Sequence, residues 1–235
     1  MEERNEAIRR LAGQETFTFG DLLAITELLR GDGGCPWDRE QTHESVRRCM
    51  IEEAYEVAEA IDRKDAVLLC EELGDVLFQV VFHAELEREE GRFGAEDVVN
   101  GICRKMIRRH PHVFGDGRAV NGREALSQWE TIKTEEKQRR TLSERLRSIP
   151  PILPALLRAQ KIHEKIGTKT VDPTGELATS AGAFSAAPSE KTLGELLDRI
   201  AAIAAEQGLD AEGSLAKMTE KAILTVENDE KHEKK

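Results

Sequence analysis

The sequence predicts an all-α protein built as a helical bundle, and three observations favour that class. Hydrophobic residues make up 39% of the 235 residues and aromatic residues only 4%, which suits helices packed by aliphatic side chains better than a β-sandwich. Apolar residues recur at the three- and four-residue spacing of amphipathic helices, and no segment alternates like a convincing strand. The length allows one ordinary domain with a smaller addition, or two small domains.

The net charge limits the partners that the protein can bind, and the cysteines indicate the compartment in which it works. The net charge of -11 should repel nucleic acid, so a polyanionic substrate would need a local basic patch or a bound cation. The charged start "MEERNEAIRR" is unlike a secretory signal, and no apolar run is long enough to cross a membrane. The cysteines form no CxxC pair, which favours reduced thiols in the cytoplasm over zinc ligands. They are Cys35, Cys49, Cys70 and Cys103.

Apolar periodicity predicts the first helices of the chain. One lies in "TFGDLLAITELLR" and is followed by the loop "GDGGCPWD", which is rich in glycine and holds a proline. Thr42 is expected to cap a second helix over about 43–61, and Asp65 a third helix over about 66–89.

The third helix is apolar on nearly every side between Leu73 and Ala84. A helix of this kind is buried on all sides, so we expect it at the centre of a bundle or in a subunit interface. The sequence therefore predicts a homo-oligomer, either a homodimer or a higher assembly.

The character of the chain changes in its second half. A fourth helix over about 95–109 and a mostly polar helix over about 123–139 come first. Residues 167–190 are rich in Gly, Ala, Ser, Thr and Pro, which is the composition of a flexible linker. Two short helical stretches follow, over about 191–206 and 212–227.

A weak internal echo links the two halves. "LGDVLFQVVFHAELEREEGRFGAEDVVNGICRK" begins at Leu73, and the shorter "LGELLDRIAAIAAEQGLDAEGSLAKMTEK" begins at Leu193. Thr192 stands where the first copy has Glu72, and no helix like that of residues 51–61 is expected before it. The tail is therefore either a degenerate half-repeat without the acidic residues or a chance similarity between amphipathic helices.

Carboxylates cluster beside the most apolar part of the chain, in "IEEAYEVAEAIDRKDAVLLCEELGDVLFQVVF". Residues three or four apart share a helix face, and a short connection pairs two helices antiparallel, so these acids could meet across the groove. The ordinary alternative is a solvated acidic face. Like charges at this spacing destabilise a helix unless a counter-charge neutralises them, and carboxylate oxygens suit Mg²⁺. The acids are Glu52, Glu53, Glu56, Glu72 and Asp75.

The wider pattern resembles a known family. "EEAYE", followed after fifteen residues by "ELGD", fits the E-E-x-x-E and E-x-x-D signature of the all-α nucleoside triphosphate pyrophosphohydrolases. In the flanks, "CPWDREQTHES", "RRHPHVFGD" and "WETIKTEEK" are similar to the MazG branch of that family. The likeness covers about residues 17–140 and continues weakly to Lys165.

The resemblance implies a helical bundle of the all-α NTP pyrophosphatase type that hydrolyses nucleoside triphosphates to the monophosphate and pyrophosphate. It also implies a nucleotide-pool house-cleaning role, and a metal site formed by the five acids that holds Mg²⁺, with Mn²⁺ as a substitute. MazG proteins typically carry two such domains, whereas the second half here lacks the acids, so we expect one active site per chain. The expected organisation is a catalytic domain over 15–145, a connecting helix over 146–166, the linker, and a degenerate helical tail over 191–235.

Hydrolysis of the α–β phosphoanhydride requires charge neutralisation, an aligned water and a stabilised leaving group. A carboxylate that is not fully used as a metal ligand can act as the general base. We favour Glu53 for this role, with Glu56 as the second catalytic carboxylate, although the sequence does not separate Glu53 from Glu52 or Glu56.

Binding of the substrate needs cations for the phosphates and a flat partner for the base. Lys105 and Arg109 share a helix face, and Lys133 lies four residues after a tryptophan. Their alternative role is ordinary charge near a helix C-terminus, but the likeness of "RRHPHVF" favours phosphate contact. Trp37, in the loop before the acidic helix, could stack on a nucleobase or close the end of the bundle.

Two rival hypotheses remain beside the pyrophosphohydrolase. One is a related all-α enzyme with a narrower substrate, such as a deoxynucleoside triphosphate or phosphoribosyl-ATP. The other is a non-catalytic helical regulator that binds metal and nucleotide, or a partner protein, without turnover. The intact set of five acids argues against the regulator.

Overall fold

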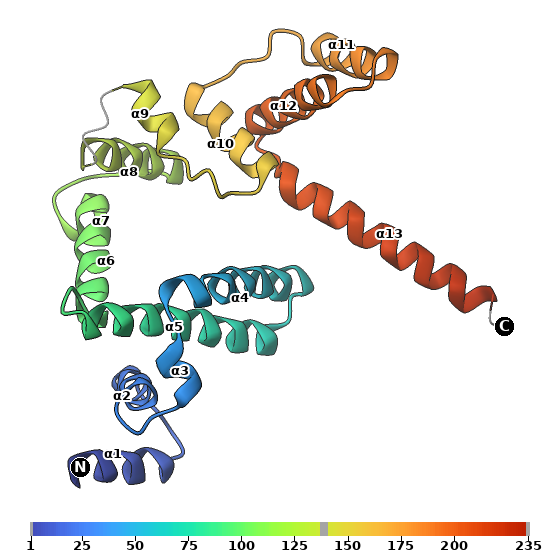
Figure 1. The fold of residues 1–235 in the computed structure, drawn as a ribbon. Coiled ribbons are helices and arrows are strands. Elements are labelled where there is room, and N and C mark those ends of the chain that lie inside the picture. The colour runs from blue at the N-terminus through green and yellow to red at the C-terminus, as the bar shows by residue number, and fades with distance from the viewer. Residues whose placement is uncertain (1, 137–140, 234–235) are drawn as a thin grey trace. The chain divides into compact units, whose positions relative to one another are not determined.

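The computed structural model describes residues 2–136 and 141–233, and every regular element in those ranges is a helix (Figure 1). This confirms the all-α class. The chain divides into two compact units, with the boundary between Trp129 and Glu130. That boundary falls inside a helix and earlier than residue 145, the expected end of the catalytic domain.

The first unit contains seven described helices and the start of an eighth. They are α1 (Glu2–Ala12), α2 (Phe19–Arg30), α3 (Pro36–Glu40), α4 (His43–Arg63), α5 (Ala66–Glu89), α6 (Ala95–Arg109), α7 (Pro111–Phe114) and α8 (Gly122–Glu136). Helix α5 is the hub of this unit, because α2, α4 and α6 all pack against it.

Local side chains explain why α4 and α5 form a hairpin. Thr42 and Ser45 cap α4 reciprocally, since each side-chain oxygen accepts a hydrogen bond from the backbone N–H of the other. Asp65 caps α5 by accepting from two backbone N–H groups. Lys64 takes the left-handed conformation (φ 56°), which ends α4 and reverses the chain within two residues. Both predicted caps are confirmed, and the short connection sets the two helices side by side (Figure 1).

Burial along α5 changes midway. In its second half Val81 and Phe82 are each 2% exposed, and Phe82 packs with Val46 and Leu86 in the core of the unit. In its first half Leu77 is 42% exposed, and Leu73, one turn earlier, is exposed as well. The helix was predicted to be buried on all sides, and in a single chain this is wrong for the first half of α5, because α4 covers only one of its faces.

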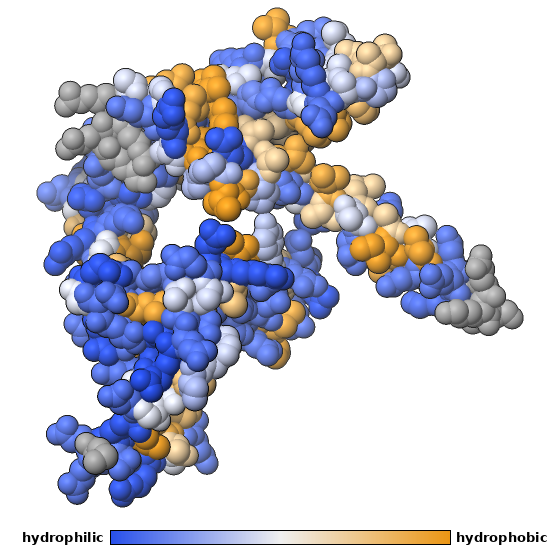
Figure 2. All heavy atoms as spheres, viewed as in Figure 1, coloured by the Kyte–Doolittle hydropathy of each residue, from blue (hydrophilic) through white to orange (hydrophobic). Residues whose placement is uncertain are grey.

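The second unit is a smaller helical cluster. It holds the end of α8 together with α9 (Leu142–Arg147), α10 (Ala155–Ile166), α11 (Pro173–Ala186), α12 (Glu190–Gln207) and α13 (Ala211–Glu233). Helix α12 packs against both α10 and α11, with Ala201 and Ala202 fully buried. Only the start of α13 lies beside α10 and α12, and apolar side chains remain exposed along its length (Figures 1 and 2).

The segment predicted to be a flexible linker, 167–190, is largely helical, so that prediction is wrong. Asp172 accepts a hydrogen bond from the backbone N–H of Gly175, and Pro173 follows the cap at the first helical position, where proline is favoured. Alanine has the highest intrinsic helix propensity, and small side chains allow close approach to α12. A segment of linker composition therefore forms a helix that contacts α12, with none of its own residues buried.

None of the helices in the described ranges combines the length and the apolar character that a membrane span requires.

Candidate metal and active site

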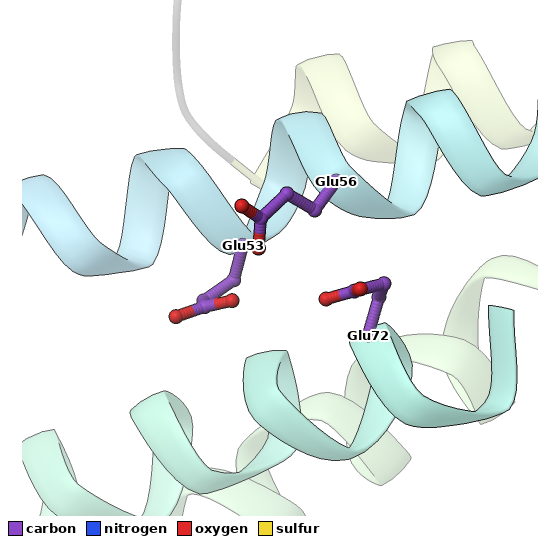
Figure 3. Close-up of side chains that lie close together, drawn as sticks. All are labelled: Glu53, Glu56 and Glu72. Atoms are coloured by element: carbon purple, nitrogen blue, oxygen red, sulfur yellow. The ribbon is translucent and has the colours of Figure 1, made fainter. Parts of the chain in front are cut away.

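Three carboxylates meet between α4 and α5. Glu53 and Glu56 lie three residues apart on α4, and Glu72 lies on the facing side of α5. One oxygen from each lies within 4.8 Å of the others. Figure 3 shows the three side chains pointing toward one another across the space between the two helices. The hairpin thus brings together acids that are 16 to 19 residues apart in sequence.

The electrostatics of this group favour a bound cation. Partial burial raises the pKa of Glu53, and a hydrogen bond with Glu56 and its negative charge raise it further. Partial burial also raises the pKa of Glu72, followed by the charge of Glu56. Asp75 lies outside the three-carboxylate group, but its charge raises the pKa of both Glu53 and Glu72. In the described parts of the chain, no lysine or arginine forms an ion pair with the three glutamates.

The structure places Glu52 apart from this group. Its carboxylate accepts a hydrogen bond from the Arg48 guanidinium at 2.6 Å, one turn earlier on α4. Adjacent residues on a helix point about 100° apart, so the face that presents Glu53 and Glu56 to α5 turns Glu52 aside. Residue spacing alone did not distinguish these two faces.

The donor set fits a hard divalent cation. It offers only carboxylate oxygens, which are ligands for Mg²⁺ or Mn²⁺, and lacks the histidine and cysteine ligands typical of zinc. Like charges whose pKa values are raised by their mutual repulsion gain stability from a counter-charge between them. Glu53, Glu56 and Glu72 could therefore hold a metal ion with Asp75 nearby.

Trp37 lies on the short helix α3, before α4, and its side chain is 61% exposed. Arg30 of α2 ties this region to α5. Its buried guanidinium donates to both carboxylate oxygens of Glu89 at 2.8 Å and to the backbone carbonyl of Asp38, and it lies 5.1 Å from the centroid of the Phe82 ring. Helix α3 is thus fixed to α5 while its indole is left free to meet a ligand. Sequence reasoning missed Arg30, because it is an ordinary last-turn arginine in the sequence pattern.

The expected phosphate-binding cations fall in both units. Arg109, at the end of α6, is only 5% exposed, and its guanidinium lies 5.1 Å from the centroid of the Trp129 ring. Lys105 is exposed one turn earlier on the same helix. Lys133 belongs to the second unit, where it lines a cavity together with other cations. Neither unit by itself therefore brings Lys105, Arg109 and Lys133 together.

A histidine pair lies at the other end of the α4–α5 hairpin. The Nδ1 atoms of His43 and His83 are 2.7 Å apart, and His43 Nε2 is 2.7 Å from a carboxylate oxygen of Glu87. Burial, followed by the charge of His43, lowers the pKa of His83. This network joins residues 40 positions apart in the sequence, so periodicity alone did not reveal it. The available signal was the placing of His83 as a polar break in an apolar helix.

Comparison with known proteins agrees with this geometry. The family model for the MazG nucleotide pyrophosphohydrolase domain matches residues 41–114, a range that includes the acids of α4 and α5. The chain is 43% identical over 215 residues to the nucleoside triphosphate pyrophosphohydrolase/pyrophosphatase MazG of Thermotoga maritima, covering 87% of this chain and 82% of the relative. It is 41% identical over 216 residues to the nucleoside triphosphate pyrophosphohydrolase of Escherichia coli K12, covering 85% and 82%.

The described helices hold a group of carboxylates between two packed helices, and the matching relatives are nucleoside triphosphate pyrophosphohydrolases. By class, the protein is therefore a nucleotide pyrophosphohydrolase. The chain belongs to the MazG family. The similarity to the Thermotoga and Escherichia relatives is too long to be confined to the first unit, so the second unit also has a counterpart in them.

Proposed function

We propose that this protein hydrolyses nucleoside triphosphates to the nucleoside monophosphate and pyrophosphate at the carboxylate group of α4 and α5. The observation that carries the proposal is the meeting of three glutamate oxygens within 4.8 Å, without a neutralising lysine or arginine among the described residues. The names of the two long relatives support the same reaction. The role would be to control the composition of the cytoplasmic nucleotide pool.

We assign the metal site to Glu53, Glu56 and Glu72, with Asp75 as a further acid beside them. A bound Mg²⁺, or Mn²⁺ in its place, would neutralise the triphosphate and lower the pKa of a coordinated water. Glu52 would join only by giving up its ion pair with Arg48.

Glu53 is the residue that we assign as the general base. Partial burial and its acidic neighbours raise its pKa, and a carboxylate with a raised pKa accepts a proton more readily once it is ionised. Glu53 would take the proton of the water that attacks the α-phosphorus, and the negative charge of neighbouring Glu56 would favour that transfer.

The remaining contacts are assigned from charge and, for Trp37, from exposure. The exposed indole of Trp37 would stack on the base, on a helix that Arg30 holds against α5. Lys105 and Arg109, near the end of α6, would contact the phosphates. Arg109 is already held over Trp129, so little side-chain entropy would be lost when it binds an anion.

We also propose that the protein works as a homodimer or a higher homo-oligomer. The exposed side chains of Leu73 and Leu77 on α5, and of Ile102 and Ile107 on α6, would be covered by a second copy. Light scattering at working concentration checks this, because a monomer would contradict it.

The testing experiment separates the products of the four ribonucleoside and four deoxyribonucleoside triphosphates by ion-exchange chromatography, with Mg²⁺ or with EDTA. Glu53→Gln is the test variant. Glu59→Gln is its matched control, because Glu59 is on the same helix but pairs with Arg63. We expect monophosphate and pyrophosphate from the wild type and from Glu59→Gln, and neither with EDTA or with Glu53→Gln.

Other outcomes distinguish the alternatives. Diphosphate and phosphate as products would show that the cleaved bond is misassigned. Turnover of a single deoxynucleotide would select the narrower enzyme, and Mg²⁺ binding without any turnover would select the non-catalytic regulator.

A further inference from the structure

A basic cavity lies within the second unit, outside the carboxylate group of α4 and α5. Its volume is about 330 Å³, and residues from the end of α8, from α9 and the turn after it, and from α10 surround it. Four of its lining side chains are cationic, two are carboxylates, two are hydroxyls and one is apolar. The cations are Lys133, Arg145, Lys161 and Lys165. In a chain of net charge -11, this cavity carries two more positive groups than negative ones.

The positive charges are only weakly compensated inside the cavity. Among the described residues, Arg145, Lys161 and Lys165 form no ion pair with a carboxylate. Lys161 and Lys165 are four residues apart on α10 and share a face, an arrangement that is unfavourable for like charges unless an anion lies between them. Glu164 accepts a hydrogen bond from Gln160 at 3.4 Å instead of pairing with these lysines.

The lining also indicates the chemical class of the ligand. Ile149 is the sole apolar lining residue, so the cavity offers no flat apolar wall for a nucleobase. The hydroxyls of Thr134 and Ser148 already donate to backbone carbonyls of their own segments. The donors that remain for an anion are the guanidinium group of Arg145 and the ammonium groups of Lys161 and Lys165, which form strong charge-assisted hydrogen bonds to phosphate oxygens.

We propose that this cavity binds a polyphosphate anion through Arg145, Lys161 and Lys165, with Lys133 as a further cation of its lining. The anion is either free inorganic polyphosphate, such as pyrophosphate or tripolyphosphate, or the polyphosphate chain of a nucleotide whose base remains outside. The inference does not require turnover at the carboxylate group, so it stands or falls separately from the proposed function.

The experiment titrates the full-length protein with sodium tripolyphosphate by calorimetry in EDTA, so that no metal ion can hold the anion at the glutamates. The test variant is Arg145→Glu/Lys165→Glu. The control is Arg147→Glu/Lys169→Glu, which makes the same change in net charge on neighbouring exposed residues that do not line the cavity. Lys133 is left unchanged because the sequence predicts that it contacts the substrate phosphates. Circular dichroism melting of both variants shows that they are folded.

We expect saturable binding by the wild type, and an affinity lower by about tenfold or more in the test variant, as the loss of charge-assisted hydrogen bonds requires. The control variant should bind within about twofold of the wild type, because Arg147 and Lys169 do not line the cavity and so cannot donate to an anion inside it. An absence of saturable binding in the wild type, or an equal loss in both variants, would overturn the proposal.

Further titrations identify the source of the anion. Binding of ATP as tight as that of tripolyphosphate, with much weaker binding of AMP, would support a nucleotide polyphosphate. Binding of tripolyphosphate and pyrophosphate but not of ATP would support free polyphosphate. If the test variant binds tripolyphosphate as tightly as the wild type, the cavity is not the site.

Discussion

The two units each contain a packed pair of neighbouring helices, α4 with α5 and α11 with α12, and the two pairs are joined in opposite ways. Between α4 and α5, glutamate oxygens face one another without a cation from the described chain. Between α11 and α12, Glu176 pairs with Arg199 at 2.6 Å, and fully buried Ala201 lies in the packed part of α12. The pair α11–α12 is thus joined by opposite charges and small residues. The pair α4–α5 instead holds acids that repel one another, an arrangement that suits a site for a metal ion.

The two copies of the internal echo begin at different positions in their helices. Gly74 is the ninth residue of α5, whereas its counterpart Gly194 is the fifth residue of α12. Thr192, at the position of Glu72, takes part in the cap of α12, where its hydroxyl accepts from the backbone N–H of Ser189 at 3.0 Å. A helix, α11, does precede the second copy, but Glu176 is its one acid, so it is unlike the acidic helix of residues 51–61. Common descent of the two pairs stays a hypothesis, and Thr192 serves the cap of its helix where Glu72 belongs to the carboxylate group.

The largest effect should come from neutralising an acid of the first pair. Glu72→Gln is expected to lower kcat/KM for nucleoside triphosphate by at least about a hundredfold, because a weakened metal site loses transition-state charge stabilisation. Glu176→Gln, the same change in the second pair, should leave kcat/KM within about twofold. Steady-state kinetics with saturating Mg²⁺ compares the two variants, and equal losses would remove the functional distinction between the pairs.

The next effect concerns packing in the second pair. Ala202 is fully buried, so Ala202→Leu should destabilise the second unit by about 1–3 kcal/mol through overpacking. Urea denaturation followed by circular dichroism measures the change, with Ala205→Leu, less buried on the same helix, as the control. A loss no greater than that of the control would show that this part of α12 is loosely packed.

A pH effect should distinguish the two pairs in EDTA. The raised pKa values of Glu53 and Glu72 mean that the folded protein binds more protons than the unfolded chain, so stability falls as pH rises from the ordinary glutamate value of 4.5 through the raised values. Glu53→Gln/Glu72→Gln lacks this loss, and its melting temperature should increasingly exceed that of the wild type as pH rises from 4.5 to 7.

The matched control for this pH series is Glu176→Gln/Glu195→Gln, which removes two carboxylates from the second unit. Its melting temperature should follow that of the wild type in parallel across the series. Parallel curves for all three proteins would mean that the acids of the first pair do not repel one another in solution.

The smallest effect is expected from the ion pair of the second pair. Glu176 and Arg199 are each about one-third exposed, so Arg199→Ala should cost only about 0.5 kcal/mol of unfolding free energy. Urea denaturation at low and high salt measures it, and the cost should shrink at high salt. A loss of several kcal/mol would show that the pair is a principal link between α11 and α12.

Local signals in the sequence predicted the first helix pair well. Thr42 and Asp65 act as the expected caps, because capping depends on residues within one helical turn. The three glutamates were among the predicted acids, whereas the separation of Glu53 from Glu52 depends on which face of α4 packs on α5. Composition failed for α11, since a small-residue segment becomes an ordered helix when a neighbouring helix provides a surface for it.

The contact between His43 and His83 has a consequence for how the end of the hairpin carries charge. With the two Nδ1 atoms 2.7 Å apart, only one of them can bear hydrogen, so one imidazole must present a lone pair to the other. The two rings together therefore hold at most one excess proton while the contact persists, and the tautomer of one dictates that of the other. Glu87, bound to the far nitrogen of His43, would favour that proton on His43.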